Sequence, residues 1–261
     1  MSLADGRAII SSTIDQPLIE ISPSLDLESG AASFARTGRA RIANFLTDGS
    51  ARRIRDLLER GTPWSLVWRA GDLPPEVIRA EALPAVTPDR ARSMQAALRT
   101  AMAARDYAFC YSTYPLVQAL LERWAPGGPH EQLLTDLNQP ALLNLIRRVT
   151  AIPDLVKADG QATLYRPGHF LARHDDAEPS KGRRVAYVLN LCGDPDGDPW
   201  RPEWGGMLQF LTDAGDPDET LLPRFNALNL FAVPQPHHVT SVASFAPVSR
   251  YAVTGWFRDR I

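Results

Sequence analysis

His174 and Asp176, two-thirds of the way along the chain, form a pattern that suits a metal ion. They stand two residues apart at the end of an expected strand, so both side chains point to the same face of that strand. A third ligand must come from another segment, and His237 or His238, at the start of a later expected strand, can supply it. Two imidazoles and one carboxylate suit non-haem Fe(II) and leave coordination positions open for substrate and O2. Such a pair also arises by chance, so it does not establish a metal site alone.

A second group of chemically active residues begins at Arg250, 13 residues after His237. On a strand, Arg250, Thr254 and Trp256 share one face, which places a guanidinium and a hydroxyl group beside an aromatic side chain. A buried arginine needs an anionic partner, and its planar fork fits a carboxylate in a bidentate manner. Two partners remain open at this point: a bound organic acid, or an Asp or Glu of the chain itself.

Taken together, the motifs resemble the 2-oxoglutarate/Fe(II)-dependent oxygenases, and within them the prolyl-hydroxylase branch. The resemblance covers roughly residues 162–258. It implies a double-stranded β-helix (jelly-roll or cupin-like) core with the metal at one open end. It also implies a dioxygenase that needs Fe(II), 2-oxoglutarate and O2, with ascorbate as a supporting reductant, and that releases succinate and CO2. The motifs that carry it are H-x-D at His174, Trp204-Gly205-Gly206-Met207-Leu208, H-x-V-x-x-V from His237, and Arg250-Tyr251-Ala252-Val253-Thr254-Gly255-Trp256-Phe257.

The resemblance assigns the metal ligands residue by residue. His174 and Asp176 match the first two iron ligands, and His237 matches the third when the H-x-V-x-x-V motif starts there. His238 is the rival for the third position, and strand alternation would put it on the opposite face. Asp176 also disfavours a halogenase, because such enzymes vacate the carboxylate position.

The resemblance assigns cosubstrate contacts as well. Arg250 matches the residue that pairs with the C5 carboxylate of 2-oxoglutarate, and Thr254 matches a supporting hydroxyl group. Tyr165, in a Y-x-x-G pattern, matches a tyrosine near the cosubstrate, although a tyrosine that only caps the barrel is an alternative. Asn190 stands where relatives often carry a second tyrosine, and we expect its amide to hydrogen-bond to the cosubstrate instead.

The elements that must position these residues differ between the two parts of the chain. Apolar residues at helical spacing predict four helices in the first 150 residues, at 50–60, 88–104, 115–124 and 139–148, after a strand at 40–46. Short β-rich runs predict seven strands at 162–165, 170–174, 184–191, 207–210, 227–231, 238–242 and 251–257. Strands at this spacing without intervening helices indicate an antiparallel sandwich or barrel. We therefore expect a mainly β fold with flanking α, as one domain over 1–261, in which residues 1–150 buttress a catalytic core at 160–261.

Composition narrows the class of protein. Hydrophobic residues make up 44% and charged residues 22% of the 261 residues, which is typical of soluble globular proteins. A net charge of -2 disfavours a dedicated nucleic-acid binder. Without a long apolar run or a secretory leader, we expect a cytoplasmic protein that does not span a membrane. The two cysteines, Cys110 and Cys192, are expected to be reduced core thiols.

The resemblance makes a prolyl residue of a protein or peptide the leading substrate class. The alternatives are a small molecule or free amino acid on the same site, a non-catalytic β-helix binding module, and a zinc hydrolase that would leave Arg250 unexplained. The segments 193–200 and 212–219 carry seven acidic residues, which either steer a basic polypeptide or are solvated turns. The sequence predicts no oligomeric state.

Overall fold

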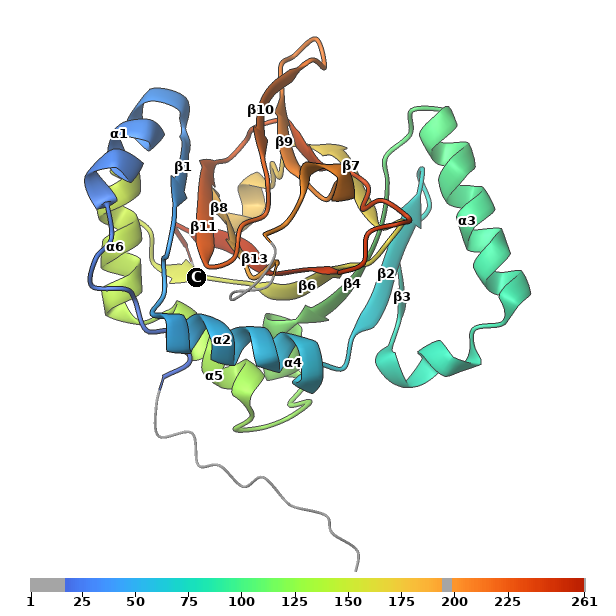
Figure 1. Ribbon diagram of the computed structural model, residues 1–261, viewed down its shortest axis with the longest axis horizontal. Coiled ribbons are helices and arrows are strands. Elements are labelled where there is room, and N and C mark those ends of the chain that lie inside the picture. The colour runs from blue at the N-terminus through green and yellow to red at the C-terminus, as the bar shows by residue number, and fades with distance from the viewer. Residues whose placement is uncertain (1–16, 194–198, 261) are drawn as a thin grey trace, which may run out of the picture.

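The structure, a computed structural model, describes residues 17–193 and 199–260. Its centre is a strongly curled sheet in which every strand pair is antiparallel (Figure 1). The strand order is β1-β11-β8-β13-β6-β4-β7-β12-β9-β10. In addition, β2 pairs with β4, β3 pairs with β2, and β5 pairs with β13. The strands are β1 (Arg39–Ile42), β2 (Ser65–Ala70), β3 (Glu76–Ile78), β4 (Ala108–Pro115), β5 (Lys157–Ala158), β6 (Gln161–Tyr165), β7 (Phe170–His174), β8 (Arg183–Asn190), β9 (Leu208–Leu211), β10 (Pro217–Leu221), β11 (Ala227–Ala232), β12 (His237–Val239) and β13 (Arg250–Arg258).

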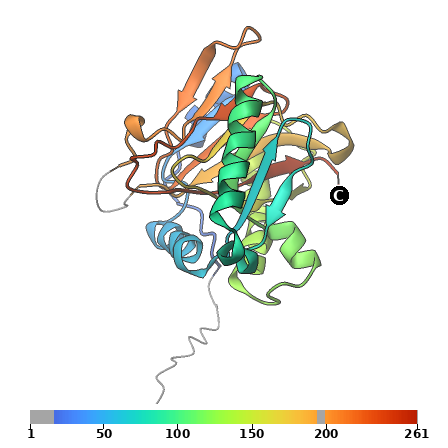
Figure 2. The ribbon, with the colours of Figure 1, turned by 90° about the vertical axis from the view of Figure 1, so that its right-hand side faces the viewer.

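Most of the helices lie on the outside of this sheet and come from the first 150 residues (Figure 1). They are α1 (Leu27–Thr37), α2 (Asp48–Asp56), α3 (Pro88–Ala103), α4 (Leu116–Leu121), α5 (Pro129–Leu137) and α6 (Pro140–Thr150). A π-helical turn, η1 (Leu57–Gly61), extends α2, and short 3-10 turns are η2 (Ala80–Ala85), η3 (Pro179–Lys181) and η4 (Pro202–Trp204). Figure 2 shows α3 lying across the β2–β3 hairpin, where Met94 and Leu98 pack against Trp68.

Strand alternation in β13 separates the core from the site. Val253 and Phe257 point outward into the large core formed with the helices, where Ile54 and Ile146 are also fully buried. The intervening residues point into the curl of the sheet, and Ala252 packs there in a second apolar cluster. The same strand therefore anchors the helices on one face and carries the functional side chains on the other.

The N-terminal end of the described chain is held by a buried carboxylate. Asp136, on α5, accepts hydrogen bonds from the backbone N–H groups of Leu18 (2.5 Å) and Ile19 (3.0 Å). This contact joins residues more than one hundred positions apart and fixes the approach to α1.

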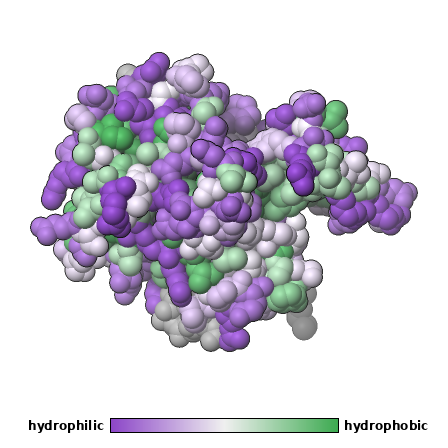
Figure 3. Space-filling view, turned by 90° about the horizontal axis from the view of Figure 1, so that it is seen from above, coloured by the Kyte–Doolittle hydropathy of each residue, from purple (hydrophilic) through white to green (hydrophobic). Residues whose placement is uncertain are grey.

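The expected fold class is confirmed: the core is a curled antiparallel sheet of the jelly-roll kind, and N-terminal helices support it. Several elements differ from expectation. The strands β2, β3 and β4 lie within the part expected to be mainly helical, β10 lies within a segment expected to be a turn, and α1 and α5 were not predicted. Among the described residues, every helix is too short or too polar to cross a lipid bilayer. The face seen from above is mainly hydrophilic, with small separate apolar patches (Figure 3).

Candidate active site

Three side chains that suit a metal ion meet at one end of the curled sheet. His174, Asp176 and His237 each offer one ligand atom, and these atoms lie within 4.8 Å of one another. Nε2 of His174 lies 3.4 Å from Oδ1 of Asp176, and Nε2 of His237 lies 3.6 Å from Oδ2 of the same carboxylate. Residues 63 positions apart meet because β12 pairs with β7 and places His237 directly opposite His174. The arrangement is a facial set of two imidazoles and one carboxylate.

Backbone carbonyl groups fix the orientation of both imidazoles. Nδ1 of His174 donates to the carbonyl of Ala172 (3.0 Å), and Nδ1 of His237 donates to the carbonyl of Gln235 (2.8 Å). A carbonyl can only accept, so Nδ1 carries the proton in each ring and Nε2 is the atom directed at Asp176. Metal-binding histidines are commonly held in this way.

The protonation of the cluster also suits a cation. Burial, with the adjacent His174, lowers the pKa of His237 to about 4, so this ring is neutral at neutral pH. Burial raises the pKa of the Asp176 carboxyl group, but the neighbouring imidazole groups lower it by more, and the net pKa lies below its ordinary value. Asp176 has a φ of 62°, in the left-handed region that aspartate tolerates better than most residues. A neutral imidazole beside an ionised carboxylate is a donor set that a divalent metal ion can use directly.

His238, the rival for the third position, lies outside this cluster. Its Nε2 is 2.7 Å from Oε1 of Gln209 on the neighbouring strand β9. The alternation of β12 therefore separates the two consecutive histidines as the sequence suggested.

Arg250 lies deep inside the same curl of the sheet and is 2% exposed. Its Nη2 donates to Oδ1 of Asn190 at 3.4 Å, which is a long hydrogen bond, and its buried Nε has no partner. Within residues 17–193 and 199–260, no carboxylate pairs with this guanidinium. Buried unpaired donors are costly, so this one fits a carboxylate that arrives with a ligand.

A cavity of about 450 Å³ joins Arg250 to the histidine cluster. Thr254 and Trp256 line it from β13, and Tyr165 lines it from β6, directly opposite Arg250 in the register. The indole N–H of Trp256 is buried on the same side of the cavity as the Asp176 carboxyl group, whose pKa it helps to lower. The volume is within the range of small-molecule sites. These residues bring a guanidinium without an internal counter-ion and three potential metal ligands to one cavity.

Asn190 takes a different place from the other expected cosubstrate residues. It is fully buried, is not part of the cavity wall, and its amide nitrogen donates to the carbonyl groups of Val188 and Ala227. Its only contact toward the site is the hydrogen bond it accepts from Arg250. In the structure Asn190 therefore holds the Arg250 guanidinium from a position outside the cavity wall.

An aromatic wall of the cavity comes from residues that the sequence analysis did not single out. Tyr107, Phe109 and Tyr111 all line the cavity, the last two from β4, and their rings contact one another in sequence order. The ring of Tyr111 stacks on Tyr165 at 5.2 Å, and the ring of Tyr107 lies 6.2 Å from that of His174. Burial raises the pKa of Tyr107 to about 12, so its hydroxyl group stays neutral and can donate a hydrogen bond. Aromatic residues at every second position, 107, 109 and 111, were the strand signal that could have identified this wall.

Of the two acidic segments, the second does not line this cavity. Residues 194–198 lie outside the described residues, and none of residues 212–219 lines the cavity. In this second segment, Asp218 and Glu219 both pair with Arg39, at 2.6 Å and 3.3 Å.

Comparison with known proteins agrees with the site. Residues 160–258 match the sequence model of the 2OG-Fe(II) oxygenase superfamily, and no curated protein sequence matches the chain. Solved structures with a similar fold include a Pseudomonas putida prolyl-4-hydroxylase, with a TM-score of 0.54 and 21% identity over 90% of this chain and 100% of that chain. An oxidoreductase of the 2OG-Fe(II) oxygenase family from Burkholderia pseudomallei has a TM-score of 0.59 and 14% identity over 92% and 94%. A Trichoplax adhaerens prolyl hydroxylase, in complex with a peptide fragment of the hypoxia inducible factor oxygen degradation domain, has a TM-score of 0.54 and 16% identity over 89% of each chain.

The same fold also carries other chemistry. SnoN, a non-haem α-ketoglutarate-dependent epimerase from nogalamycin biosynthesis, has a TM-score of 0.51 and 14% identity over 88% of this chain and 80% of that chain. At these identities the solved structures establish a shared fold alone. The resemblance of the motifs to the 2-oxoglutarate/Fe(II)-dependent oxygenases is confirmed for residues 160–258, which match the sequence model of that superfamily.

Proposed function

We propose that the protein is an Fe(II)- and 2-oxoglutarate-dependent dioxygenase that hydroxylates an unactivated C–H bond, and that its substrate is a prolyl residue of a protein or peptide. One observation carries the proposal. A facial cluster of two histidines and one aspartate shares an enclosed cavity with an arginine whose buried Nε lacks a partner. A metal site alone would not require Arg250, and an internal ion pair is not what holds it.

Each residue would have a defined part in that activity. His174, Asp176 and His237 would hold Fe(II), and Arg250 would bind the C5 carboxylate of 2-oxoglutarate, with Asn190 supporting its guanidinium. When bound, the iron with 2-oxoglutarate and O2 supplies the oxidising chemistry, and succinate and CO2 are the co-products. The chain itself orients the two bound groups and excludes water with its aromatic walls.

Two further residues complete the cosubstrate pocket in this proposal. Tyr165 lies against Arg250, with the guanidinium 5.1 Å from its ring centre, and Thr254 offers a hydroxyl group from the same face of β13, four residues after Arg250. Both would contact 2-oxoglutarate, Tyr165 through its ring and Thr254 through its hydroxyl group. Tyr165 is also packed against Tyr111, so it would hold its position before any ligand binds.

The prolyl substrate is the finer part of the proposal. The aromatic side chains of Tyr107, Phe109 and Trp256 around the cavity suit an apolar ring, and two solved proteins with this fold are prolyl hydroxylases. SnoN shows that the fold also occurs in an epimerase, so a small molecule on the same site is the alternative.

The test is a coupled oxidation assay. The full chain is incubated in air with Fe(II), 2-oxoglutarate and ascorbate, together with a library of proline-containing peptides, and mass spectrometry follows the gain of one oxygen atom per peptide. We expect succinate formation that matches peptide oxidation and that stops in the His174→Ala variant. Succinate formed only with small molecules would favour the alternative. Absence of succinate from folded, iron-loaded protein, across peptides and small molecules, would contradict the proposed function.

A further inference from the structure

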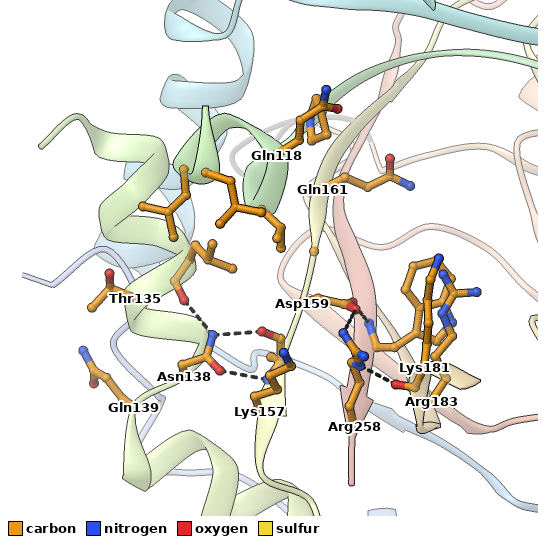
Figure 4. A pocket seen from close by; sticks show the side chains of 18 of the residues that line it. Gln118, Thr135, Asn138, Gln139, Lys157, Asp159, Gln161, Lys181, Arg183 and Arg258 are labelled. Carbon is orange, nitrogen blue, oxygen red and sulfur yellow. Dashed lines mark hydrogen bonds and ion pairs between the residues drawn. The ribbon is translucent and has the colours of Figure 1, made fainter. Parts of the chain in front are cut away.

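A second, larger cavity opens beside the active-site cavity. Its volume is about 1050 Å³, and it lies between helices α4 and α5 on one side and β13 with η3 on the other, floored by β5 and the start of β6 (Figure 4). Gln161, Arg183 and Trp256 line both cavities. The groove therefore adjoins the active-site cavity at the end of β13, where Trp256 borders both spaces.

The two walls of this groove differ in chemistry. Helix α4 supplies an apolar wall from Val117, Leu120 and Leu121, and Leu121 is 76% exposed although it is a large apolar side chain. The opposite wall and the floor carry basic residues: Lys157, Lys181, Arg183 and Arg258 (Figure 4). An exposed apolar stripe facing a row of cations is a surface suited to a ligand that has both apolar and acidic groups.

The acidic residues of the groove are already engaged. Asp159 accepts a hydrogen bond from the backbone N–H of Trp256 and lies 3.5 Å from Nη1 of Arg258. Glu122, at the far end, accepts hydrogen bonds from Gln118 and Trp124. Each carboxylate also has a cation nearby, Arg258 for Asp159 and Arg79 for Glu122 (3.7 Å), which offsets part of its repulsion of an acidic ligand.

The basic residues of the groove are only partly neutralised by carboxylates of the chain. Lys181 and Arg183 share one carboxylate, that of Glu178, at 2.8 Å and 3.1 Å. Arg183 stacks on Trp256, with its guanidinium 3.6 Å from the ring centre, and its buried Nε has no partner. Within the described parts of the chain, Lys157 forms no ion pair. The groove thus has an excess of positive charge in a protein whose net charge is -2.

We propose that this groove binds an acidic segment of the polypeptide substrate, next in sequence to the residue that is oxidised in the cavity. The inference rests on the proposed function, since it names the substrate class of the same site. Carboxylates of the segment would lie against Lys157, Lys181 and Arg183, and its apolar side chains would lie on α4. Because the two cavities adjoin at Trp256, one extended chain would pass from the groove to the active site. The proposed substrate segment is therefore acidic, whereas the acidic segments 193–200 and 212–219 would have favoured a basic one.

The test uses the full, iron-loaded protein and a peptide library. Each peptide has a central proline with a flank of Asp/Glu, Ala or Lys residues on either side. We expect acidic-flank peptides to be oxidised with a kcat/KM at least about tenfold above that of Lys-flank peptides, mostly through KM, and the difference should shrink as salt is added. Fluorescence anisotropy with labelled peptides measures binding separately from turnover.

Two variants with the same change in charge test whether the preference for acidic flanks comes from the groove. Lys157→Glu should remove most of the preference for acidic flanks, whereas Arg99→Glu, on the exposed side of α3 away from the groove, should leave it intact. Peptides oxidised equally whatever their flanks, or an equal effect of both variants, would overturn the inference while leaving the proposed function standing. Acidic peptides that bind but are never oxidised would instead contradict the proposed function and retain the groove as a binding site. The library comparison needs no variant, so it remains decisive if Lys157→Glu fails to fold.

Discussion

Replacing Arg250 with methionine should stabilise the protein that lacks 2-oxoglutarate and weaken its binding of 2-oxoglutarate. The guanidinium is 2% exposed, makes one hydrogen bond of 3.4 Å to Asn190, and leaves Nε unpaired. A buried charge without a counter-ion is costly, and apolar replacement of buried ionic groups is often neutral or stabilising by about 1–4 kcal/mol. We therefore expect Arg250→Met to raise the free energy of unfolding, or to leave it unchanged, in denaturant titrations without 2-oxoglutarate.

The effect of Arg250→Met on binding has the opposite sign. Removing one partner of a buried charged contact costs about 2–5 kcal/mol, which is roughly a 30-fold to several-thousand-fold increase in Kd at 1.4 kcal/mol for each factor of ten. The assay measures thermal stabilisation by 2-oxoglutarate with Mn(II) in place of Fe(II). Ligand at about one hundred times the wild-type Kd stabilises the wild type by about 2.7 kcal/mol, and at the same concentration the variant should be stabilised by about 0.9 kcal/mol at most. Arg250→Lys, which keeps the charge without the fork, should lie between the two.

One result would refute this reasoning. A variant that loses more than about 1 kcal/mol of stability without 2-oxoglutarate, yet is still stabilised by 2-oxoglutarate like the wild type, would make Arg250 a structural residue.

Three further predictions concern other parts of the structure. Asp136→Ala, which leaves the N–H of Leu18 without its buried acceptor, should lower the free energy of unfolding by about 3 kcal/mol in denaturant titrations. Gly206→Ala places a Cβ 3.3 Å from Cδ of Arg250 at a φ of 63°, so it should raise the KM for 2-oxoglutarate several-fold; an unchanged KM would contradict the packing argument. Burial lowers the pKa of His130 to about 4 from about 6.5 when unfolded, so the folded state binds fewer protons and stability is lost as pH falls from 6.5 towards 4. The His130→Gln variant should lose less stability over that range, and an equal loss would contradict the assignment.

The catalytic half of the fold was predictable because its signals are local. Short alternating runs separated by Pro, Gly and Asp marked the strands that carry His174 and Arg250, and residue types at spacings of two placed Thr254 and Trp256 on the face of Arg250. The meeting of His174 with His237 is a matter of strand pairing, which the sequence expresses only through its likeness to relatives.

The missing strands in the first half show where local patterns fail. In β2 both faces are largely buried, because α3 covers one face and the curled sheet the other, so hydrophobic residues do not alternate cleanly with polar ones. Within β10, only Glu219 and Leu221 are partly buried and the other residues are exposed, so its composition is that of a turn.

The place of Asn190 shows a different limit. The family resemblance puts this residue at a cosubstrate position, and in the structure its amide nitrogen donates to the backbone of β8 and β11 while its oxygen accepts from Arg250. Which side of a neighbour a short side chain occupies depends on packing in three dimensions. Spacing along one strand carries no information about it.

The most direct test of the central claim is the visible spectrum of the protein with Fe(II) and 2-oxoglutarate under anaerobic conditions. We expect a weak charge-transfer band for the wild type and for His238→Ala, whose imidazole lies outside the cluster. The band should be absent in His174→Ala and His237→Ala. No band in folded wild-type protein at saturating reagents, or a band that survives His237→Ala but not His238→Ala, would contradict it.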